Sequence, residues 1–385
     1  MPCRWASQNL ERGSFVIHRP EVVIVGAGPA GLATAIAASL KGLRTVVVDA
    51  RKPPIDKSCG EGLLPHGAAA LTALGLRLRP DVAIPFHGIR FLDEQSSACA
   101  EFEDSPGFAL RRIRLNQLLI ERAAEVGVVF RWGVRVAGFD SRQIWIEGQP
   151  IPYDWLIGAD GQSSIVRKWV HLDSRRASPR RFAFRRHFQI RPWSSVVEVY
   201  WARGCQVVVT PTGAEEVGVA AISRDPRLRL KQALPLFPAL AGRLRDATPV
   251  SSELGDTTAL TRLSAVTRGR VALAGDASGS VDAVTGHGLS LAFQQALHLA
   301  DALARNDLAH YESAHRKIAA MPAVMTRLML TMDGFAWARR KVLRLFEKSP
   351  ELFSKLLSVH TGALPLSAFS VGEMLDFGWR LLRAE

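Results

Sequence analysis

The chain has 385 residues, of which 48% are hydrophobic and 22% are charged, and its formal net charge is +13. This length can bury a large core and hold more than one domain, but no apolar run approaches the roughly 20 residues that a membrane-spanning helix needs. The four cysteines form no Cys-x-x-Cys pair, which argues against a metal site or a disulfide framework and fits a cytoplasmic protein. No helix-turn-helix, zinc-finger or RNA-binding signature accompanies the basic charge, so we expect no nucleic-acid partner.

The first elements form a nucleotide-binding unit. Residues 1–20 carry charge throughout and lack an apolar signal core, so we expect a loose N-terminal extension. A β-rich run at 21–25 leads through a glycine loop into an alanine-rich helix at 32–40, and residues 44–49 form a second strand. This strand–loop–helix–strand order is the setting that a dinucleotide-binding fingerprint requires.

Each glycine of this loop has a physical role in binding a dinucleotide or in packing. Gly26 permits a tight turn, Gly28 lets the backbone approach a pyrophosphate, and Gly31 lets helix and strand pack closely. The helix N-terminus offers free N–H groups to the phosphates, and Asp49 can accept hydrogen bonds from ribose hydroxyls. The other residues that we expect at the cofactor here are Pro29, Ala30, Ala50 and Arg51.

The rest of the chain changes pattern twice. A helix is expected from about residue 111 to 126, and a buried strand runs from residue 153 to 159. Residues 175–265 have the pattern of an antiparallel sheet. Residues 270–274 are predicted to form another buried strand, and a helical region is predicted to begin with residues 288–303. Further strands are expected at 80–107, 128–139 and 143–147.

These patterns predict an α/β protein in which a Rossmann-type domain is interrupted by a β-sheet substrate domain. The expected segments are an N-terminal extension (1–20), a discontinuous nucleotide-binding domain (21–80, 108–174 and 266–335), a β-sheet domain (81–107 and 175–265) and C-terminal helices (336–385).

Three motifs along the chain carry a family resemblance. They are the glycine loop 26–31, the pair Asp160-Gly161 and the pair Gly275-Asp276. In this order they resemble FAD oxidoreductases of the p-hydroxybenzoate hydroxylase class, whose FAD domain has the glutathione reductase-like fold. The resemblance implies a bound FAD, with Asp276 at the ribityl or ribose region and Arg112 as a further contact. It also links Asp160-Gly161 with FAD and pyridine nucleotide binding.

Two further stretches are similar to the geranylgeranyl reductase branch of that class. They are residues 59–65 (CGEGLLP) and 281–288 (VDAVTGHG). Ala283 and His287 depart from the proline and glutamate common in that branch, and both lie beside the expected flavin ring. Residues 60–65 also resemble a stretch of flavin-dependent halogenases, but the WxWxIP motif of those enzymes is absent.

Four residues are candidates for catalysis. His287 lies in the Gly286-His287-Gly288 turn, where it can add a positive charge beside the reduced flavin or simply begin a helix. Cys59 is either a proton donor or plain packing, and Glu61 is either an acid or a loop cap. Arg186 shares a strand face with several phenylalanines, which suggests a pocket contact or a paired interior group. The cofactor set also includes Leu289.

The function expected from this resemblance is that of an FAD-dependent monooxygenase. It would use NAD(P)H, visiting transiently because no second GxGxxG exists, and hydroxylate a hydrophobic aromatic or polyketide-like small molecule through a flavin C4a-hydroperoxide. The main alternative is a C=C reductase of an isoprenoid; a halogenase and a non-catalytic flavoprotein remain further alternatives. The basic, amphipathic tail at 339–383 either covers the core or contacts the inner face of a membrane.

Overall fold

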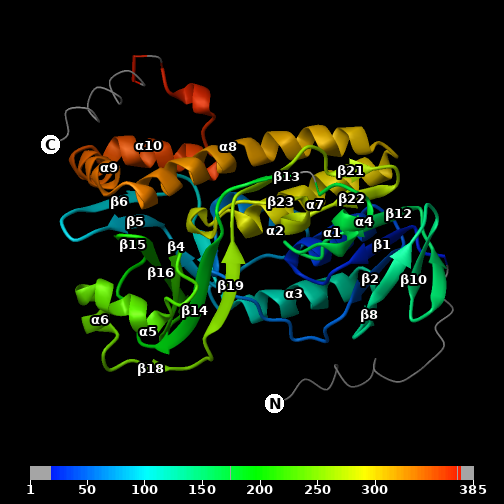
Figure 1. The fold of residues 1–385 in the computed structure, drawn as a ribbon, viewed down its shortest axis with the longest axis horizontal. Coiled ribbons are helices and arrows are strands. Elements are labelled where there is room, and N and C mark those ends of the chain that lie inside the picture. Colours follow the sequence, from blue (N-terminus) through cyan, green and yellow to red (C-terminus); the bar gives the residue numbers. More distant parts are fainter. Residues whose placement is uncertain (1–18, 174, 371, 374–385) are drawn as a thin grey trace.

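The computed structural model describes residues 19–173, 175–370 and 372–373, and it has the predicted α/β fold (Figure 1). The expected N-terminal extension at 1–20 lies outside the described residues apart from residues 19 and 20. The same holds for residues 374–385, the end of the expected helical tail.

A six-stranded sheet forms the centre of the nucleotide-binding part. Its order is β21-β22-β12-β1-β2-β8, and all neighbours are parallel except the β21–β22 pair. The strands are β21 (Thr267–Arg268), β22 (Val271–Leu273), β12 (Trp155–Gly158), β1 (Val22–Val25), β2 (Thr45–Asp49) and β8 (Val129–Trp132). Every residue of β1 and β2 is buried, as expected for central parallel strands that are covered on both faces.

Helices cover this sheet, and they include the three helices that the sequence predicts, at about 32–40, 111–126 and 288–303. They are α1 (Pro29–Leu40), α2 (Pro65–Ala73), α3 (Arg112–Glu125), α4 (Ile165–Trp169) and α7 (Gly288–Ala304). Helix α1 packs between α3 and α7, so the start of α1 and the start of α7 belong to the same layer of the fold. The short 3₁₀ helices are η1 (Leu234–Leu236), η2 (Gly275–Ser278), η3 (Ala283–Thr285) and η4 (Leu366–Ala368).

An eight-stranded sheet lies beside this domain (Figure 1). It contains β18 (Thr248–Pro249), β14 (Arg181–Gln189), β17 (Glu216–Ser223), β16 (Cys205–Gly213), β15 (Val197–Ala202), β5 (Gly88–Leu92), β6 (Ser97–Glu101) and β19 (Leu254–Thr258), which pairs with β14. The sheet is antiparallel as predicted, except that β5 runs parallel to β15. Helices α5 (Leu230–Ala233) and α6 (Pro238–Arg243) pack on its apolar residues.

Three small sheets complete the fold. They are formed by β3 (Gly62–Leu63), β7 (Gly107–Ala109) and β4 (Ile84–Phe86); by β9 (Val136–Phe139), β10 (Gln143–Ile146) and β11 (Gln149–Pro152); and by β13 (Arg175–Ala177), β20 (Thr261–Leu263) and β23 (Gly279–Ser280). The single strand predicted at 128–139 is divided between β8 and β9, because Gly133 between them takes a left-handed φ of 74°. The domain limits stay a prediction.

The C-terminal region is helical and lies along the top of Figure 1. It consists of α8 (Leu308–Gly334), α9 (Ala336–Lys348) and α10 (Pro350–Thr361), of which α9 and α10 pack against β6. No helix within the described residues combines the length and the apolar character needed to cross a membrane.

Candidate functional site

Two glycines of the loop after β1 are required by the fold itself. Gly26 has a φ of 109°, and a Cβ atom there would lie 2.4 Å from the carbonyl oxygen of Ala159. A Cβ atom on Gly31 would lie 1.8 Å from the carbonyl oxygen of Gly26. The loop therefore packs backbone against backbone, and neither position has room for a side chain.

Gly28 has no such structural reason to be glycine. Its φ of −72° suits any residue, and no atom of the protein lies within 4 Å of where its Cβ would be. Gly28 precedes Pro29 and Ala30 at the start of α1, and no side chain caps this helix. An uncapped helix N-terminus with an open approach is suited to an anion such as a pyrophosphate.

Asp49 lies beside this loop at the end of β2. Its carboxylate accepts hydrogen bonds from the backbone N–H of Ala27 at 2.7 Å and of Arg51 at 2.8 Å. The structure thus brings the second strand's acidic residue, with Ala50 and Arg51 after it, to the glycine loop. Contact between Asp49 and a ribose stays a prediction.

A second open helix start lies at α7. Gly288 begins α7, no side chain caps the helix, and nothing lies within 4 Å of a Cβ at Gly288. Gly286 has a left-handed φ of 68°, which turns the chain into the helix just before Leu289. A Cβ on Gly275 would lie 2.5 Å from the Cβ of Ala30, so the Gly275-Asp276 motif packs directly on the start of α1.

Arg112, the first residue of α3, has a buried guanidinium nitrogen without a partner among the described residues. Its residue is 4% exposed, and its Nη1 atom has no hydrogen-bond partner among the described residues. Burial lowers the pKa of this guanidinium, although the nearby acidic side chains oppose the shift. A buried, unpartnered guanidinium nitrogen is costly unless a ligand accepts from it.

The carboxylate of Asp276 is held by Lys57. The two charged groups are 3.3 Å apart, and Lys57 also contacts Asp256 at 3.0 Å. Burial alone would lower the pKa of Lys57, but Asp276 and Asp256 raise it above its usual value. Lys57 therefore fixes the orientation of Asp276 from the loop that follows β2.

Taken together, these residues fit an extended FAD. Gly28 and the start of α1 would hold the phosphates, Asp276 and Arg112 the part between, and Gly288 with the start of α7 the flavin ring. FAD bound there would supply the redox chemistry, while the protein determines its position and surroundings.

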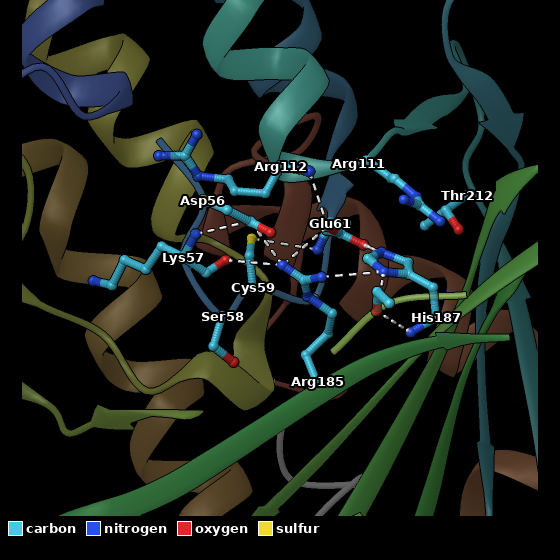
Figure 2. Close-up of polar contacts among 12 residues, drawn as sticks. Asp56, Lys57, Ser58, Cys59, Glu61, Arg111, Arg112, Arg185, His187 and Thr212 are labelled. Carbon is cyan, nitrogen blue, oxygen red and sulfur yellow. Dashed lines mark hydrogen bonds and ion pairs between the residues drawn. The ribbon is translucent and has the colours of Figure 1, made fainter. Parts of the chain in front are cut away.

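A buried polar cluster faces this site from the loop 56–61 and from β14. Figure 2 shows Glu61 between Arg112 and His187, with Cys59 and Arg185 beside it. The carboxylate of Glu61 accepts from the backbone N–H of Arg112 at 2.8 Å and lies 2.6 Å from Nε2 of His187. Glu61 is 2% exposed and takes a left-handed φ of 61°, so the fold holds this acid in place despite the strained backbone.

The hydrogen bonds of Arg185 determine the tautomer of His187. Arg185 binds Asp56 at 2.8 Å, and its Nη1 lies 3.1 Å from Nδ1 of His187. Because a guanidinium only donates, Nδ1 accepts and Nε2 carries the proton that is shared with Glu61. The half-buried hydroxyl of Ser251 also lies 3.0 Å from Nδ1. Ser251, His187 and Glu61 thus form a chain of hydrogen-bonding groups from the protein's surface to the site.

Cys59 lies at the inner end of this cluster. Its Sγ accepts from the backbone N–H of Glu61 at 3.3 Å. Burial raises the pKa of the Cys59 thiol, and Arg112 opposes this only in part. The thiol is therefore protonated at neutral pH, which suits a proton donor and not a thiolate nucleophile.

Two of the predicted catalytic residues have other surroundings than expected. Arg186 lies on the opposite strand face from Arg185 and His187, and its guanidinium donates to the carbonyl of Ser251 at 3.0 Å, outside the Glu61 cluster. His287 donates to the carbonyl of His360 at 2.8 Å, and burial lowers the pKa of His287 to about 4. Its imidazole is neutral at pH 7, so the expected positive charge beside the flavin is absent.

Asp160 has a structural task next to Gly161. Its carboxylate accepts from the backbone N–H groups of Ile165 at 2.7 Å and Val166 at 3.3 Å, which caps α4. Gly161 has a φ of 80°, which the turn into this helix requires. A contact between Asp160-Gly161 and a nucleotide stays a prediction.

Sequence reasoning missed three basic residues on one face of β14. Besides Arg185 and His187, Arg181 forms a fully buried pair with Asp282 at 2.8 Å, which anchors the loop before α7. Their positions 181, 185 and 187 share one strand face, and this charged periodicity was visible in the sequence. Side chains on this one face of β14 thus hold both the loop 56–61 and the loop before α7.

Comparisons with known proteins agree with this geometry. The family model described as FAD binding domain matches residues 19–307. A menaquinone reductase of Mycolicibacterium smegmatis is 29% identical, over 85% of this chain and 85% of its own length. A 12-dehydrotetracycline 5-monooxygenase/anhydrotetracycline 6-monooxygenase of Streptomyces rimosus is 28% identical over 73% of this chain and 62% of its own. The crystal structure of a flavoprotein/dehydrogenase from Cytophaga hutchinsonii has the same fold, with a TM-score of 0.76 and 18% identity over 89% of this chain and 93% of its own.

Proposed function

Because the chain belongs to the FAD binding domain family and is an FAD-dependent oxidoreductase, we propose that it is a monooxygenase that hydroxylates a hydrophobic aromatic molecule. NAD(P)H is the proposed reductant. The observation that supports this proposal is the buried Glu61–His187 pair, 2.6 Å apart, on the side of the site that faces the eight-stranded sheet.

The chemistry of hydroxylation explains why such a pair is useful. FAD, when bound, supplies the electrons with which dioxygen is activated. Insertion of an electrophilic oxygen into an aromatic ring is easier when the ring is rich in electrons, and a ring hydroxyl enriches it by losing its proton. Glu61 can accept that proton, and the Nε2–H of His187 holds the carboxylate in place for the transfer. Arg185, at 3.7 Å from Glu61, stabilises the ionised carboxylate.

A second candidate function is the reduction of a C=C bond, and Cys59 favours it. Hydrogen addition to an alkene needs a proton as well as a hydride, and the thiol of Cys59 keeps its proton at neutral pH. The menaquinone reductase that resembles this chain over 85% of its length also supports this candidate. In this case Glu61 and His187 would restore the proton of Cys59 after each turnover.

One pair of assays separates the two candidates. The reduced protein is mixed with a long-chain alkylphenol under isotopically labelled dioxygen, and separately with a menaquinone under anaerobic conditions. Label in the phenol product supports the monooxygenase. Gain of two hydrogens in the isoprenoid chain of the menaquinone, measured after the quinone ring has been reoxidised, supports the reductase. Cys59→Ala should abolish only the second reaction. Absence of both reactions, with FAD bound and reducible, contradicts both candidates.

A further inference from the structure

Helix α8 presents an apolar stripe to solvent. Val324 is 49% exposed and Leu328 is 39% exposed. The two residues are one turn apart, on the face of α8 opposite the buried residues of the helix. The stripe continues into the junction with α9, where Phe335 is 55% and Trp337 is 61% exposed. The two aromatic rings lie 6.3 Å apart. We call these four residues the α8–α9 patch.

The exposed charges of residues 316–340, which include the patch, have one sign. Lys317, Arg327 and Arg340 are exposed on the same two helices. Between residues 316 and 340 the sequence holds a single acidic residue, Asp333. Asp333 is buried and bound to Arg224 at 3.1 Å, so it contributes no exposed negative charge. An apolar, aromatic surface framed by cations is the combination that binds an anionic lipid surface.

An apolar cavity lies directly behind the patch. Leu328 belongs to both, since it is exposed and also lines the cavity. The cavity has a volume of about 40 Å³, room for a few water molecules. Its walls come from α8, α9, α10 and β5, and they include the flexible side chains of Met325, Met329 and Met332. Methionines adapt readily to a ligand, so the cavity can widen around an apolar chain.

The inner end of the cavity reaches the start of α7. His360 lines the cavity, accepts a hydrogen bond from Nε2 of His287 at its carbonyl, and donates to the carbonyl of Thr285 at 3.1 Å. The rings of His360 and His287 meet edge to face, with centroids 4.2 Å apart. The cavity therefore extends from Leu328 of the α8–α9 patch to His360, which contacts His287 beside the proposed flavin position.

We propose that the α8–α9 patch docks on the surface of an anionic phospholipid bilayer and that the cavity behind Leu328 receives the apolar chain of a lipid-soluble substrate. The second half rests on the proposed function, whereas the docking does not. Trp337 and Phe335 enter the interface between head groups and acyl chains, and Lys317, Arg327 and Arg340 contact the anionic head groups. A protein partner is the competing occupant of the patch.

Vesicle flotation tests the docking. The native protein should float with vesicles that contain phosphatidylglycerol and phosphatidylcholine, and weakly with phosphatidylcholine alone. The double variant Phe335→Ala/Trp337→Ala should bind the anionic vesicles at least about tenfold more weakly. Leu236→Ala removes an apolar side chain that is 43% exposed and lies outside the patch, and this variant should bind as the native protein does. Both variants change exposed residues, so folding should be intact by circular dichroism.

Two results would overturn the docking. One is no flotation with anionic vesicles, or flotation that the double variant leaves unchanged. The other is a self-association in light scattering that only the double variant abolishes, because the patch would then bind a second copy of the chain.

A cavity-filling variant tests the substrate half. Met329→Trp changes a buried cavity residue outside the patch, so it should keep flotation but lower turnover of a long-chain alkylphenol at least about tenfold, and spare the same phenol without its chain. Equal loss for both substrates, or none for either, contradicts the proposed role of the cavity. If the native protein converts neither phenol, the proposed function fails, while flotation still decides the docking.

Discussion

The glycine loop after β1 and the Glu61 cluster lie on two sides of the proposed site. The loop is formed by backbone groups, whereas the cluster is formed by side chains. The loop uses backbone groups of six neighbouring residues, 26–31, and its packing leaves no space at Gly26 or Gly31. The cluster uses side chains from the segment 56–61, from α3, from β14 and from Ser251. The loop should therefore fail when one carbon atom is added, and the cluster when one charge is removed.

The largest effect is expected from Gly31→Ala. The new Cβ would lie 1.8 Å from a backbone oxygen, which no side-chain rotation can relieve. We expect the free energy of unfolding to fall by about 3 kcal/mol or more, measured by urea denaturation. Gly242→Ala is the matched control, because nothing lies within 4 Å of its Cβ and alanine favours a helix. Equal stability of the two variants would mean that the loop is not packed as described.

Removing the charge of Glu61 should affect turnover next most strongly. Glu61→Gln keeps the backbone and the size of the side chain but can no longer exchange a proton with His187. We expect turnover to fall about a hundredfold while FAD stays bound, measured by stopped-flow absorbance of the flavin. Glu216→Gln, at the Arg111 pair near the rim of the cluster, is the control. Unchanged turnover in Glu61→Gln would reduce the cluster to a structural element.

The neighbouring residues Arg185 and Arg186 allow a comparison of two faces of β14. Arg185→Ala leaves Asp56 and Glu61 without their cation, and it should lower the free energy of unfolding by about 2 kcal/mol, since Asp56 is partly exposed. Arg186→Ala removes one bond to the Ser251 carbonyl and should stay within about 1 kcal/mol of the native protein. Thermal and urea unfolding measure both. If Arg186→Ala lost more free energy of unfolding than Arg185→Ala, the face of β14 that carries Arg186 would be the more important one for stability.

Acid should weaken the α7 end of the site through its buried histidines. Burial lowers the pKa of His287 to about 4 and that of His66 to about 3, below the unfolded value of 6.5. The unfolded chain therefore binds these protons first. The stabilisation is complete above pH 6.5, and it is lost as the pH falls towards 4 for His287 and towards 3 for His66. Each group should contribute a slope of up to about 1.4 kcal/mol per pH unit. His287→Gln should remove one group's share of that slope, and an unchanged slope would contradict its burial in the neutral form.

The backbone-built parts of the molecule could be predicted because their signals are local. The glycine loop, α3 and the helix after Gly288 follow from short motifs and helical spacing, and the structure confirms them. The pairing of β5 with β15 could not be predicted. The two strands are parallel and about a hundred residues apart in the sequence, so no tight turn between them indicates that they pair.

The side-chain cluster was only partly predictable for the same reason. Cys59 and Glu61 could be chosen from their motif, but their partner His187 comes from a distant strand. On β14 it is Arg185 that binds the segment 56–61, whereas Arg186, on the other face, donates to Ser251, and a contact of Arg186 with a substrate stays a prediction. The neutral state of His287 depends on α10, which follows about seventy residues later and buries the imidazole.

Titration of the apoprotein with FAD tests the central claim most directly, with Gly28→Ala as the variant. Gly28 is the one glycine of the loop that the fold does not require, so alanine should leave the urea midpoint of the apoprotein unchanged. If the pyrophosphate lies against Gly28, the added methyl group should weaken FAD binding by about tenfold or more, or about 1.4 kcal/mol. Native affinity for FAD in a fully folded Gly28→Ala protein would contradict the account.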